Sequence, residues 1–166
     1  SRLNETQYSS METVRTDSLY YCSSDASAAV AIDQQRFIMA DDEINFLQVY
    51  YWDMPGSDPN IETDISSALT LDPAHPEADF EGATWFNDRI FWITSHGRSQ
   101  FGDYWQSRYN FFATTIEPNG SVTVDGVYTN LIDDLIQYDR IWNLGLEAAI
   151  GTAGDHIDQS SIADLA

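Results

Sequence analysis

The sequence contains no lysine: its seven basic residues are all arginines, and they stand against 27 aspartates and glutamates. The resulting net charge of −20 at pH 7 repels nucleic acids and anionic membranes, so the composition argues against DNA or RNA binding. Two interpretations of the carboxylates remain open. They form a solvated acidic surface, which is the default for most of them, or some of them are collected to hold divalent cations such as Ca²⁺ or Mg²⁺.

Cysteine is nearly absent as well. The single residue, Cys22, cannot form an internal disulfide and is expected to pack as a small apolar side chain. No apolar run approaches the length of a membrane span, and no signal peptide is visible. The abrupt first and last residues suggest part of a longer polypeptide. The compartment stays unknown from the sequence, with a periplasmic or extracellular location slightly favoured.

Aromatic residues, in contrast, make up 13% of the chain and gather in short runs that favour β-strands. Residues 1–18 are polar and show no clear period. Turn residues such as Pro, Gly, Asn and Asp divide the chain after residue 18 into short segments. The predicted strands are residues 28–32, 36–40, 46–52, a short edge strand from 61, and then 82–86, 89–94, 109–116 and 121–128.

The order of these segments repeats. The stretch AIDQQRFIMADDE (31–43) aligns without gaps over TWFNDRIFWITSH (84–96), which places Arg36 over Arg89, 53 residues later. A unit of about four strands recurring at this period is typical of a β-propeller blade. The sequence therefore predicts an all-β fold, a partial β-propeller with one blade at 23–66 and another at 78–128. A small β-sandwich with one helix is the alternative.

The last third has a different pattern. Apolar residues at 131, 132, 135 and 136 follow a helical spacing, which predicts a helical insertion near 130–145. The rest of 129–166 is expected to begin another element. Two blades cannot close a ring and would expose long sheet edges. We therefore expect that a second chain, or a C-terminal half that is missing here, completes the propeller.

Two stretches carry a family resemblance, SDASAAVAIDQQRFIMADDE and EADFEGATWFNDRIFWITSHGR. Together they resemble an uncharacterised family of bacterial β-propeller proteins, a domain of unknown function in which the motifs DASAA, ADDE, EGA and SHGR recur in this order. The resemblance covers about residues 22–116. It implies a domain about twice as long as this chain, with a further blade just after residue 166. It implies no activity, because none is established for the family.

A weaker similarity is to gluconolactonase-like and phytase-like propellers. In the lactonase group a Glu-Gly-Pro-x-Trp strand start places its glutamate on a divalent metal in the central channel. EGATW, residues 81–85, has alanine where that motif has proline. The similarity thus implies a metal-binding role for Glu81, which the changed residue puts in question.

Acidic residues precede the innermost strand of each predicted blade, where residues can face the channel of a propeller. In the second blade Glu77, Asp79 and Glu81 alternate, so they lie on one side of an extended chain. Asp25 occupies the corresponding stretch of the first blade. Asp25, Asp79 and Glu81 are therefore the candidate Ca²⁺ or Mg²⁺ ligands. The alternative is that these side chains only cap turns and bind backbone amides.

The loop after the second strand of the second blade carries His96 and Arg98, and Arg108 follows before the next strand. Histidine can act as a general base or metal ligand, and arginine can bind a phosphate or carboxylate with two hydrogen bonds. These three residues are the candidate catalytic groups, and they would suit a small anionic ligand. In the simpler interpretation the two arginines pair with the abundant acids, and His96 binds a neighbouring strand.

Two functions from different classes fit these features. The first is a metal-dependent hydrolase that acts on phosphoesters or lactones, with Ca²⁺ polarising the substrate oxygen. The second is a non-catalytic acidic propeller that serves as a binding or assembly module. Clustering of Asp25, Asp79, Glu81 and His96 around one pocket would favour the enzyme, whereas separate salt bridges would favour the binding module.

Overall fold

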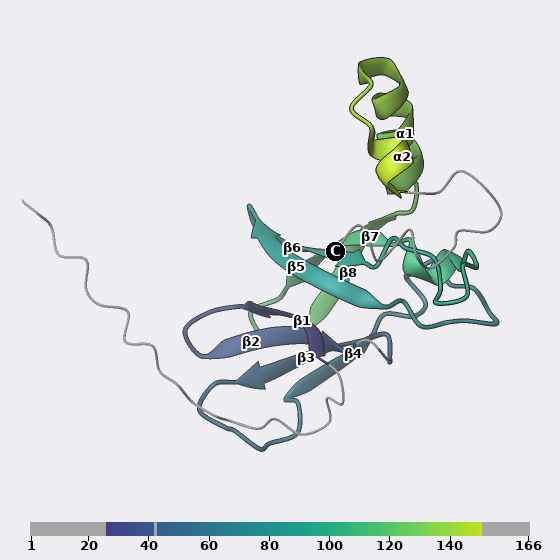
Figure 1. Cartoon of the computed structure of the whole chain (residues 1–166). Helices are drawn as coiled ribbons and strands as arrows, with labels where there is room; N and C mark the ends of the chain where they lie inside the picture. Colours follow the sequence, from purple (N-terminus) through teal and green to yellow (C-terminus); the bar gives the residue numbers. More distant parts are fainter. Residues whose placement is uncertain (1–25, 42, 151–166) are drawn as a thin grey trace, which may run out of the picture.

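The computed structural model describes residues 26–41 and 43–150, and it contains two four-stranded antiparallel sheets followed by two helices (Figure 1). In each sheet the strands lie side by side in sequence order. The first sheet contains β1 (Ala26–Ala31), β2 (Arg36–Asp41), β3 (Phe46–Tyr51) and β4 (Ile61–Asp64). The second contains β5 (Phe80–Phe86), β6 (Arg89–Thr94), β7 (Phe111–Ile116) and β8 (Val122–Tyr128). The chain is therefore mainly β, as predicted from its sequence.

The first hairpins of the two sheets differ by one turn residue. In sheet 1 the turn spans residues 33–35, where Asp33 Oδ1 accepts hydrogen bonds from the backbone N–H groups of Gln35 and Arg36, both at 2.8 Å. In sheet 2 only residues 87–88 separate the strands, and Asn87 takes a positive φ of 57° that suits a tight hairpin. The side chain of Asp33 thus stabilises the longer turn locally.

This extra residue changes the alignment of the two sheets. β2 and β6 have equal length, and their first residues lie 53 positions apart. On the first strands, however, Val30 pairs with Ile38, and Thr84 pairs with Phe91, so the separation there is 54. The gapless alignment is consequently wrong by one residue on the first strands, because it ignores the longer turn.

The main core lies between the two sheets. Ile38 of β2 is fully buried there, in one cluster with Ile90 and Trp92 of β6. Trp92 also stacks on Phe112 of β7, with ring centroids 6.2 Å apart. The two sheets are further joined by the Trp85 indole, whose Nε1 donates to the Ala31 carbonyl at 2.7 Å. Burial of these large side chains is the main source of stability for the packed pair.

The two sheets meet through faces that do not correspond. Ile38 points toward sheet 2, and its counterpart 53 residues later on β6 is Phe91. Phe91 points away from sheet 1, because neighbouring residues of a strand alternate and Ile90 and Trp92 fill the core. The packed face of sheet 1 is the one that carries Ile38. The packed face of sheet 2 is the opposite one, which carries Ile90 and Trp92 and not Phe91.

The segment between the sheets, residues 65–79, is held by two asparagines that directly precede third strands. Asn45 donates from Nδ2 to the Pro76 carbonyl at 2.8 Å and accepts at Oδ1 from the Ala78 N–H at 3.0 Å. Asn110 binds both the N–H and the carbonyl of Thr70, at 3.0 and 3.1 Å. These bonds satisfy backbone groups of the connecting segment that no strand pairs.

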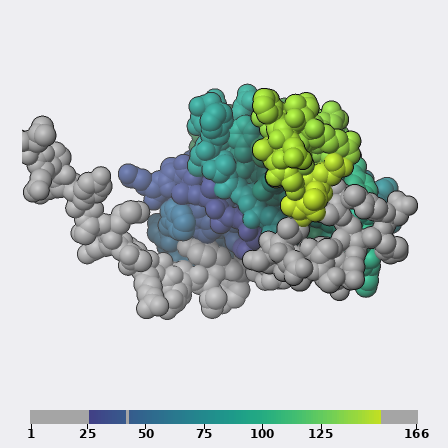
Figure 2. All heavy atoms as spheres, turned by 45° about the horizontal axis from the view of Figure 1, so that its top comes forward, coloured from purple at the N-terminus to yellow at the C-terminus, as the bar shows by residue number. Residues whose placement is uncertain are grey.

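The predicted helix near 130–145 is present as α1 (Leu131–Trp142), and α2 (Leu146–Ile150) follows it. The pair extends away from the two sheets (Figure 1) and, in the space-filling view, lies next to the teal surface of sheet 2 (Figure 2). Asn143 ends α1 in the left-handed conformation, with φ 52°. Asp139 accepts hydrogen bonds from the N–H groups of Leu144 and Glu147, and these bonds lower the pKa of its carboxyl group. Within the described ranges, no helix has the length and apolar character needed to cross a membrane.

Candidate functional site

The predicted metal ligand Asp79 and the predicted anion-binding residue Arg108 contact each other. Their side chains form an ion pair of 2.7 Å between Oδ2 and Nη1, and each is about a quarter exposed, at 27% and 22%. Asp79 adopts a left-handed backbone conformation, with φ 57°, and its carbonyl accepts from the Ser95 N–H at 2.9 Å. Asp79 and Arg108 therefore neutralise one another directly before β5.

Glu81, the second predicted ligand, follows two residues after Asp79. It stands where the pairing of β5 with β6 shifts register between Phe80 and Gly82, and it is exposed. Asp25, the third predicted ligand, lies outside the described residues. Across residues 26–41 and 43–150, no three His, Cys, Asp or Glu side chains are arranged to hold a metal ion.

A cavity of about 250 Å³ nevertheless lies beside Asp79. Two further carboxylates line it, Glu43 from the loop after β2 and Glu77 from the segment before β5. His75 and Trp105 close one side as a stacked pair, with ring centroids 3.9 Å apart. The cavity is thus lined by three acids and by the guanidinium of Arg108. Its lining residues come from the β2–β3 loop, the β6–β7 loop and the segment between the sheets.

His96 lies next to this ion pair along the backbone, but it lines neither this cavity nor the larger one beside the helices. Its N–H donates to the Arg108 carbonyl at 2.8 Å. Its ring Nδ1 lies 2.8 Å from the Thr94 carbonyl oxygen, so Nδ1 carries the proton and donates. Nε2 is buried and has no hydrogen-bond partner among the described residues. Burial lowers the pKa of His96, only partly offset by the Thr94 carbonyl, so the ring is neutral at pH 7.

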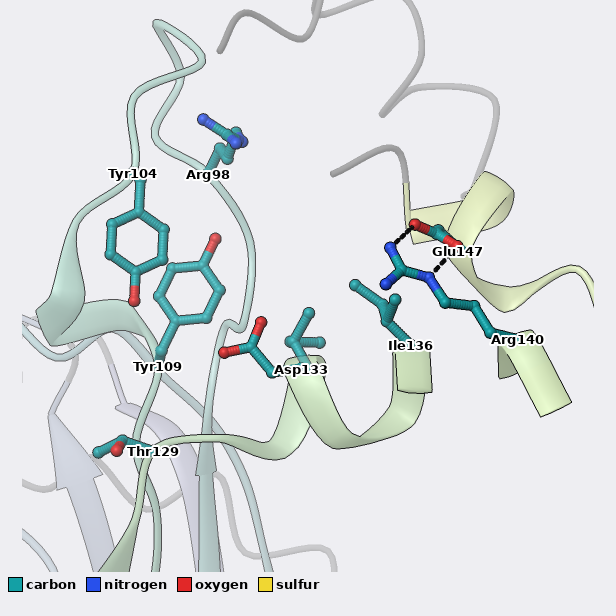
Figure 3. Close-up of a pocket in the computed structure, with 9 residues that line it drawn as sticks. Arg98, Tyr104, Tyr109, Thr129, Asp133, Ile136, Arg140 and Glu147 are labelled. Carbon is teal, nitrogen blue, oxygen red and sulfur yellow. Dashed lines mark hydrogen bonds and ion pairs between the residues drawn. The ribbon is translucent and has the colours of Figure 1, made fainter. Parts of the chain in front are cut away.

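Arg98 is separated from these groups and lines a second cavity, of about 530 Å³ (Figure 3). One wall is the loop between β6 and β7, which includes the short 3₁₀ helix Gln106–Arg108, and the other is formed by α1 and α2. Arg98 donates from Nη1 to the Gly102 carbonyl at 3.2 Å. The remaining residues that line the cavity are Tyr104, Tyr109, Thr129, Ile132, Asp133, Ile136, Arg140 and Glu147.

Two tyrosines of the loop form the aromatic side of this cavity. The rings of Tyr104 and Tyr109 stack with centroids 4.5 Å apart and planes inclined by 25°. Tyr109 is buried, and burial raises the pKa of its hydroxyl; the nearby Arg98 counteracts part of this increase. On the helical side, Arg140 and Glu147 form an ion pair with two hydrogen bonds, so these two charges satisfy each other.

The structure therefore separates the residues singled out from the sequence into two places. Asp79, Arg108 and the backbone of His96 lie together at the start of β5, whereas Arg98 lies in the larger cavity. Sequence reasoning missed the tyrosines and the helical residues that complete the larger cavity. The one sequence signal that could have indicated this cavity was the concentration of aromatic residues around Arg98 in SHGRSQFGDYWQSRY. Comparisons with protein-family models, with curated proteins and with solved structures find no match to this chain.

Proposed function

We propose that this chain is part of a β-propeller and acts as a non-catalytic binding or assembly module. The observation that carries the proposal is the packing of the two sheets through faces that do not correspond, which leaves Phe91 on an open face where its counterpart Ile38 is buried. Membership of the uncharacterised propeller family, suggested by the sequence motifs, is part of the same proposal.

A contact between non-corresponding faces of two similar units is a head-to-tail contact, and further units can be added to it in the same way. A two-fold axis would bring corresponding faces together, whereas a contact between opposite faces leaves one face of each unit available for the next unit. Repetition of the same step produces a ring or a filament. In addition, β1 and β5 make the most extensive contact between the sheets, and these are the first strands of the two meanders. Close approach of first strands is typical of neighbouring propeller blades.

The open face of sheet 2 is apolar and aromatic, like a surface that packs against another element. Phe86, Phe91 and Phe111 form a row of rings with centroids 6.0 and 5.7 Å apart, and Phe86 is 65% exposed. Together with Gly82 and Ile93 they line a shallow apolar cavity of about 510 Å³. An exposed apolar surface of this kind marks an interaction site. The occupant that fits is a further four-stranded sheet that presents large side chains, as sheet 2 presents Ile90 and Trp92 to sheet 1.

The proposal is tested by Phe91→Glu in the natural protein, together with whatever chain or continuation completes it. The variant is expected to lose the assembled form or the folded third sheet, as measured by light scattering and circular dichroism. Phe101→Glu is the matched control, because Phe101 is 68% exposed in the loop after β6. The measured mass distinguishes a second chain from a continuation. A natural protein that tolerates Phe91→Glu as well as Phe101→Glu would contradict the proposal.

The ion pair of Asp79 with Arg108 favours the non-catalytic interpretation, because it occupies a predicted ligand and a predicted substrate-binding residue at once. A metal-dependent hydrolase is the second candidate: Glu43, Glu77 and Asp79 line one cavity, although as placed they do not form a group that could hold a metal ion. In such an enzyme Ca²⁺ would polarise a phosphoryl or carbonyl oxygen, and Arg108 would bind the substrate anion. Titration calorimetry with Ca²⁺ separates the two.

For the hydrolase candidate, binding heat is expected with the unmodified protein and reduced heat with Asp79→Asn. Glu81→Gln measures separately whether Glu81 contributes. Asp88→Asn, in the exposed hairpin turn of sheet 2, is the control for the loss of one negative charge. Absence of saturable Ca²⁺ binding would leave the binding or assembly module as the function.

A further inference from the structure

The helix α1 carries apolar residues on two of its sides. Ile132 and Ile136 line the cavity beside the β6–β7 loop. Leu135, Tyr138 and Trp142 follow one another at spacings of three and four residues, so they lie along one side of the helix. That side is turned by roughly 100° from the two isoleucines. The three residues are exposed, at 37%, 52% and 61% in chain order, and are called here the exposed stripe of α1.

The stripe lacks the cover that apolar residues of a surface helix usually have. Such a helix normally has one apolar side, which packs on the core, and polar residues opposite. Tyr138 and Trp142 contact each other, with ring centroids 6.0 Å apart, but both remain more than half exposed. Ile141 and Leu144 add two further exposed apolar side chains at the end of the helix. An exposed apolar surface of this kind marks an interaction site.

The spacing of the stripe favours a helical partner. Half-buried Leu131 extends the series toward the start of α1, so apolar residues occur at 131, 135, 138 and 142. Steps of four, three and four residues are the a and d spacing with which two helices pack along a common seam. Over the 12 residues of α1 this seam is about 18 Å long, which corresponds to about three turns of a partner helix.

The helices around the stripe are acidic. α1 and α2 together carry four carboxylates and one arginine. The arginine, Arg140, is already paired with Glu147. Asp134 is exposed and directly precedes Leu135 of the stripe. A partner that covers the stripe is therefore favoured by positive charges next to its own apolar residues.

The chain itself does not supply this complement. A second copy would bring another net charge of −20 and a second acidic helix to the same place. Residues 151–166 contain three aspartates and no arginine or lysine. Residues 1–25 contain four acids and two arginines. All three candidates have the wrong sign of charge, so the charge pattern favours a different protein.

We propose that the exposed stripe of α1 binds an amphipathic helix of another protein, with lysine or arginine residues beside its apolar side. The apolar side chains of this helix pack between Leu135, Tyr138 and Trp142. Its cations lie near Asp134, and the face of an aromatic ring of the stripe adds a favourable contact with one of them. The stripe is separate from the open face of sheet 2, so the proposal does not depend on another sheet covering Phe91.

Fluorescence anisotropy with labelled synthetic peptides tests the proposal on the whole chain. The probe has the length of α1, with leucines at helical spacing on one side and lysines elsewhere. One comparison peptide has glutamate in place of lysine, and another has the composition of the probe in an order that spreads the leucines over all sides. We expect saturable binding of the probe, and binding weaker by about tenfold or more for both comparison peptides.

Two outcomes of this comparison would overturn the proposal. Equal binding of the probe and the reordered peptide would show that the acidic surface attracts any cationic peptide. No binding of the probe would mean that the chain's own terminal residues occupy the stripe or that it takes no such helix.

Variants of the chain locate the bound probe. Tyr138→Gln is expected to weaken binding by about tenfold, because glutamine suits a helix but removes the ring. Phe101→Gln, in the exposed β6–β7 loop, is the matched control. Phe86→Gln reports whether the probe binds the open face of sheet 2 instead. Circular dichroism checks that α1 stays helical, and Trp142→Gln is a second variant of the stripe if Tyr138→Gln disturbs the helix. Unchanged affinity in both stripe variants, or an equal loss in Phe86→Gln, would contradict the proposal.

Two further measurements examine the charge and the alternative occupant. Asp134→Asn is expected to weaken probe binding by about threefold, whereas Asp88→Asn, in the exposed hairpin turn of sheet 2, should leave it unchanged. Equal effects of the two variants would contradict the assigned position of the cations. Analytical ultracentrifugation measures self-association of the chain. A dimer that dissociates in Tyr138→Gln would assign the stripe to a second copy and overturn the proposal.

Discussion

Ile38 and Phe91 occupy the same place on the second strands of their sheets, yet Ile38 is fully buried between the sheets and Phe91 lies on the open face of sheet 2. Corresponding positions thus have different environments only because a partner sheet covers one and not the other. This difference is what a chain of head-to-tail sheets produces at its last member. It also gives a direct comparison between two apolar side chains.

The effect of truncating each side chain depends on its burial. In the 166-residue chain, Ile38→Ala is expected to lower the free energy of unfolding by about 3–5 kcal/mol, because it leaves a cavity in the core. Phe91→Ala is expected to lower it by about 1 kcal/mol, since this ring is only partly buried and loses mainly its contacts with Phe86 and Phe111. Urea unfolding measures both. Equal losses would mean that the face of Phe91 is already covered.

The asparagine before β7 is expected to be important for stability. Asn110 is fully buried and makes three hydrogen bonds to backbone groups, two to Thr70 and one of 2.8 Å to the Ser107 carbonyl. Asn110→Ala should lower the free energy of unfolding by about 2–4 kcal/mol, because it leaves buried backbone groups without partners. Asn60→Ala, on the exposed segment before β4, is the control and should change it by less than about 0.5 kcal/mol. Comparable effects of the two variants would contradict this role of Asn110.

The buried imidazole of His96 predicts a pH dependence of stability. Its pKa is lowered in the folded protein, so the unfolded chain takes up the proton first as the pH falls. The free energy of unfolding should therefore be highest above about pH 6.5, the usual histidine pKa, and should decrease as the pH falls from there toward the lowered pKa. Urea unfolding between about pH 7.5 and 5.5 measures this decrease.

The matched variant for this effect is His96→Asn, since asparagine tolerates the positive φ of 50° at this position. The variant should lose less stability over the same pH range than the unmodified protein. His75→Asn, at an exposed position, controls for the loss of a histidine. An identical pH dependence in His96→Asn and the unmodified protein would show that another group is responsible.

The ion pair of Asp79 with Arg108 can be measured with a double-mutant cycle. Asp79→Asn, Arg108→Gln and the double variant should give a coupling energy of about 0.5–1 kcal/mol, because both side chains keep contact with water. Asparagine again suits the positive φ of Asp79, so the cycle does not add backbone strain. The coupling should decrease in about 1 M NaCl. A coupling near zero at low salt would mean that the two residues are independent in solution.

The strands were predictable from sequence because their signals are local. β6 was placed with its bounds, Arg89–Thr94, and the other strands of sheet 2 began within two residues of the predicted positions. The alignment between the sheets was less predictable, because it depends on whether Asp33 adds a residue to a turn. The residue types around Asp33 and Asn87 indicate a turn in both cases and do not define its length.

The candidate sites were predicted only in part, because their contacts are made between loops distant in sequence. That Asp79 pairs with Arg108 depends on the path of the long β6–β7 loop, which has no counterpart of equal length in sheet 1. Likewise, Arg98 and Asp133 line one cavity only because α1 turns back beside that loop. Residue types alone indicated what each side chain could do chemically, but they did not indicate which residues it would contact.

An experimental structure of the natural protein, with the chain or continuation that completes it, tests the propeller proposal most directly. We predict another four-stranded antiparallel sheet packed on Phe86, Phe91 and Phe111, related to sheet 2 by the rotation that relates sheet 2 to sheet 1. Solvent over these three rings, or a second copy of sheet 2 packed on them through a two-fold axis, would contradict the proposal.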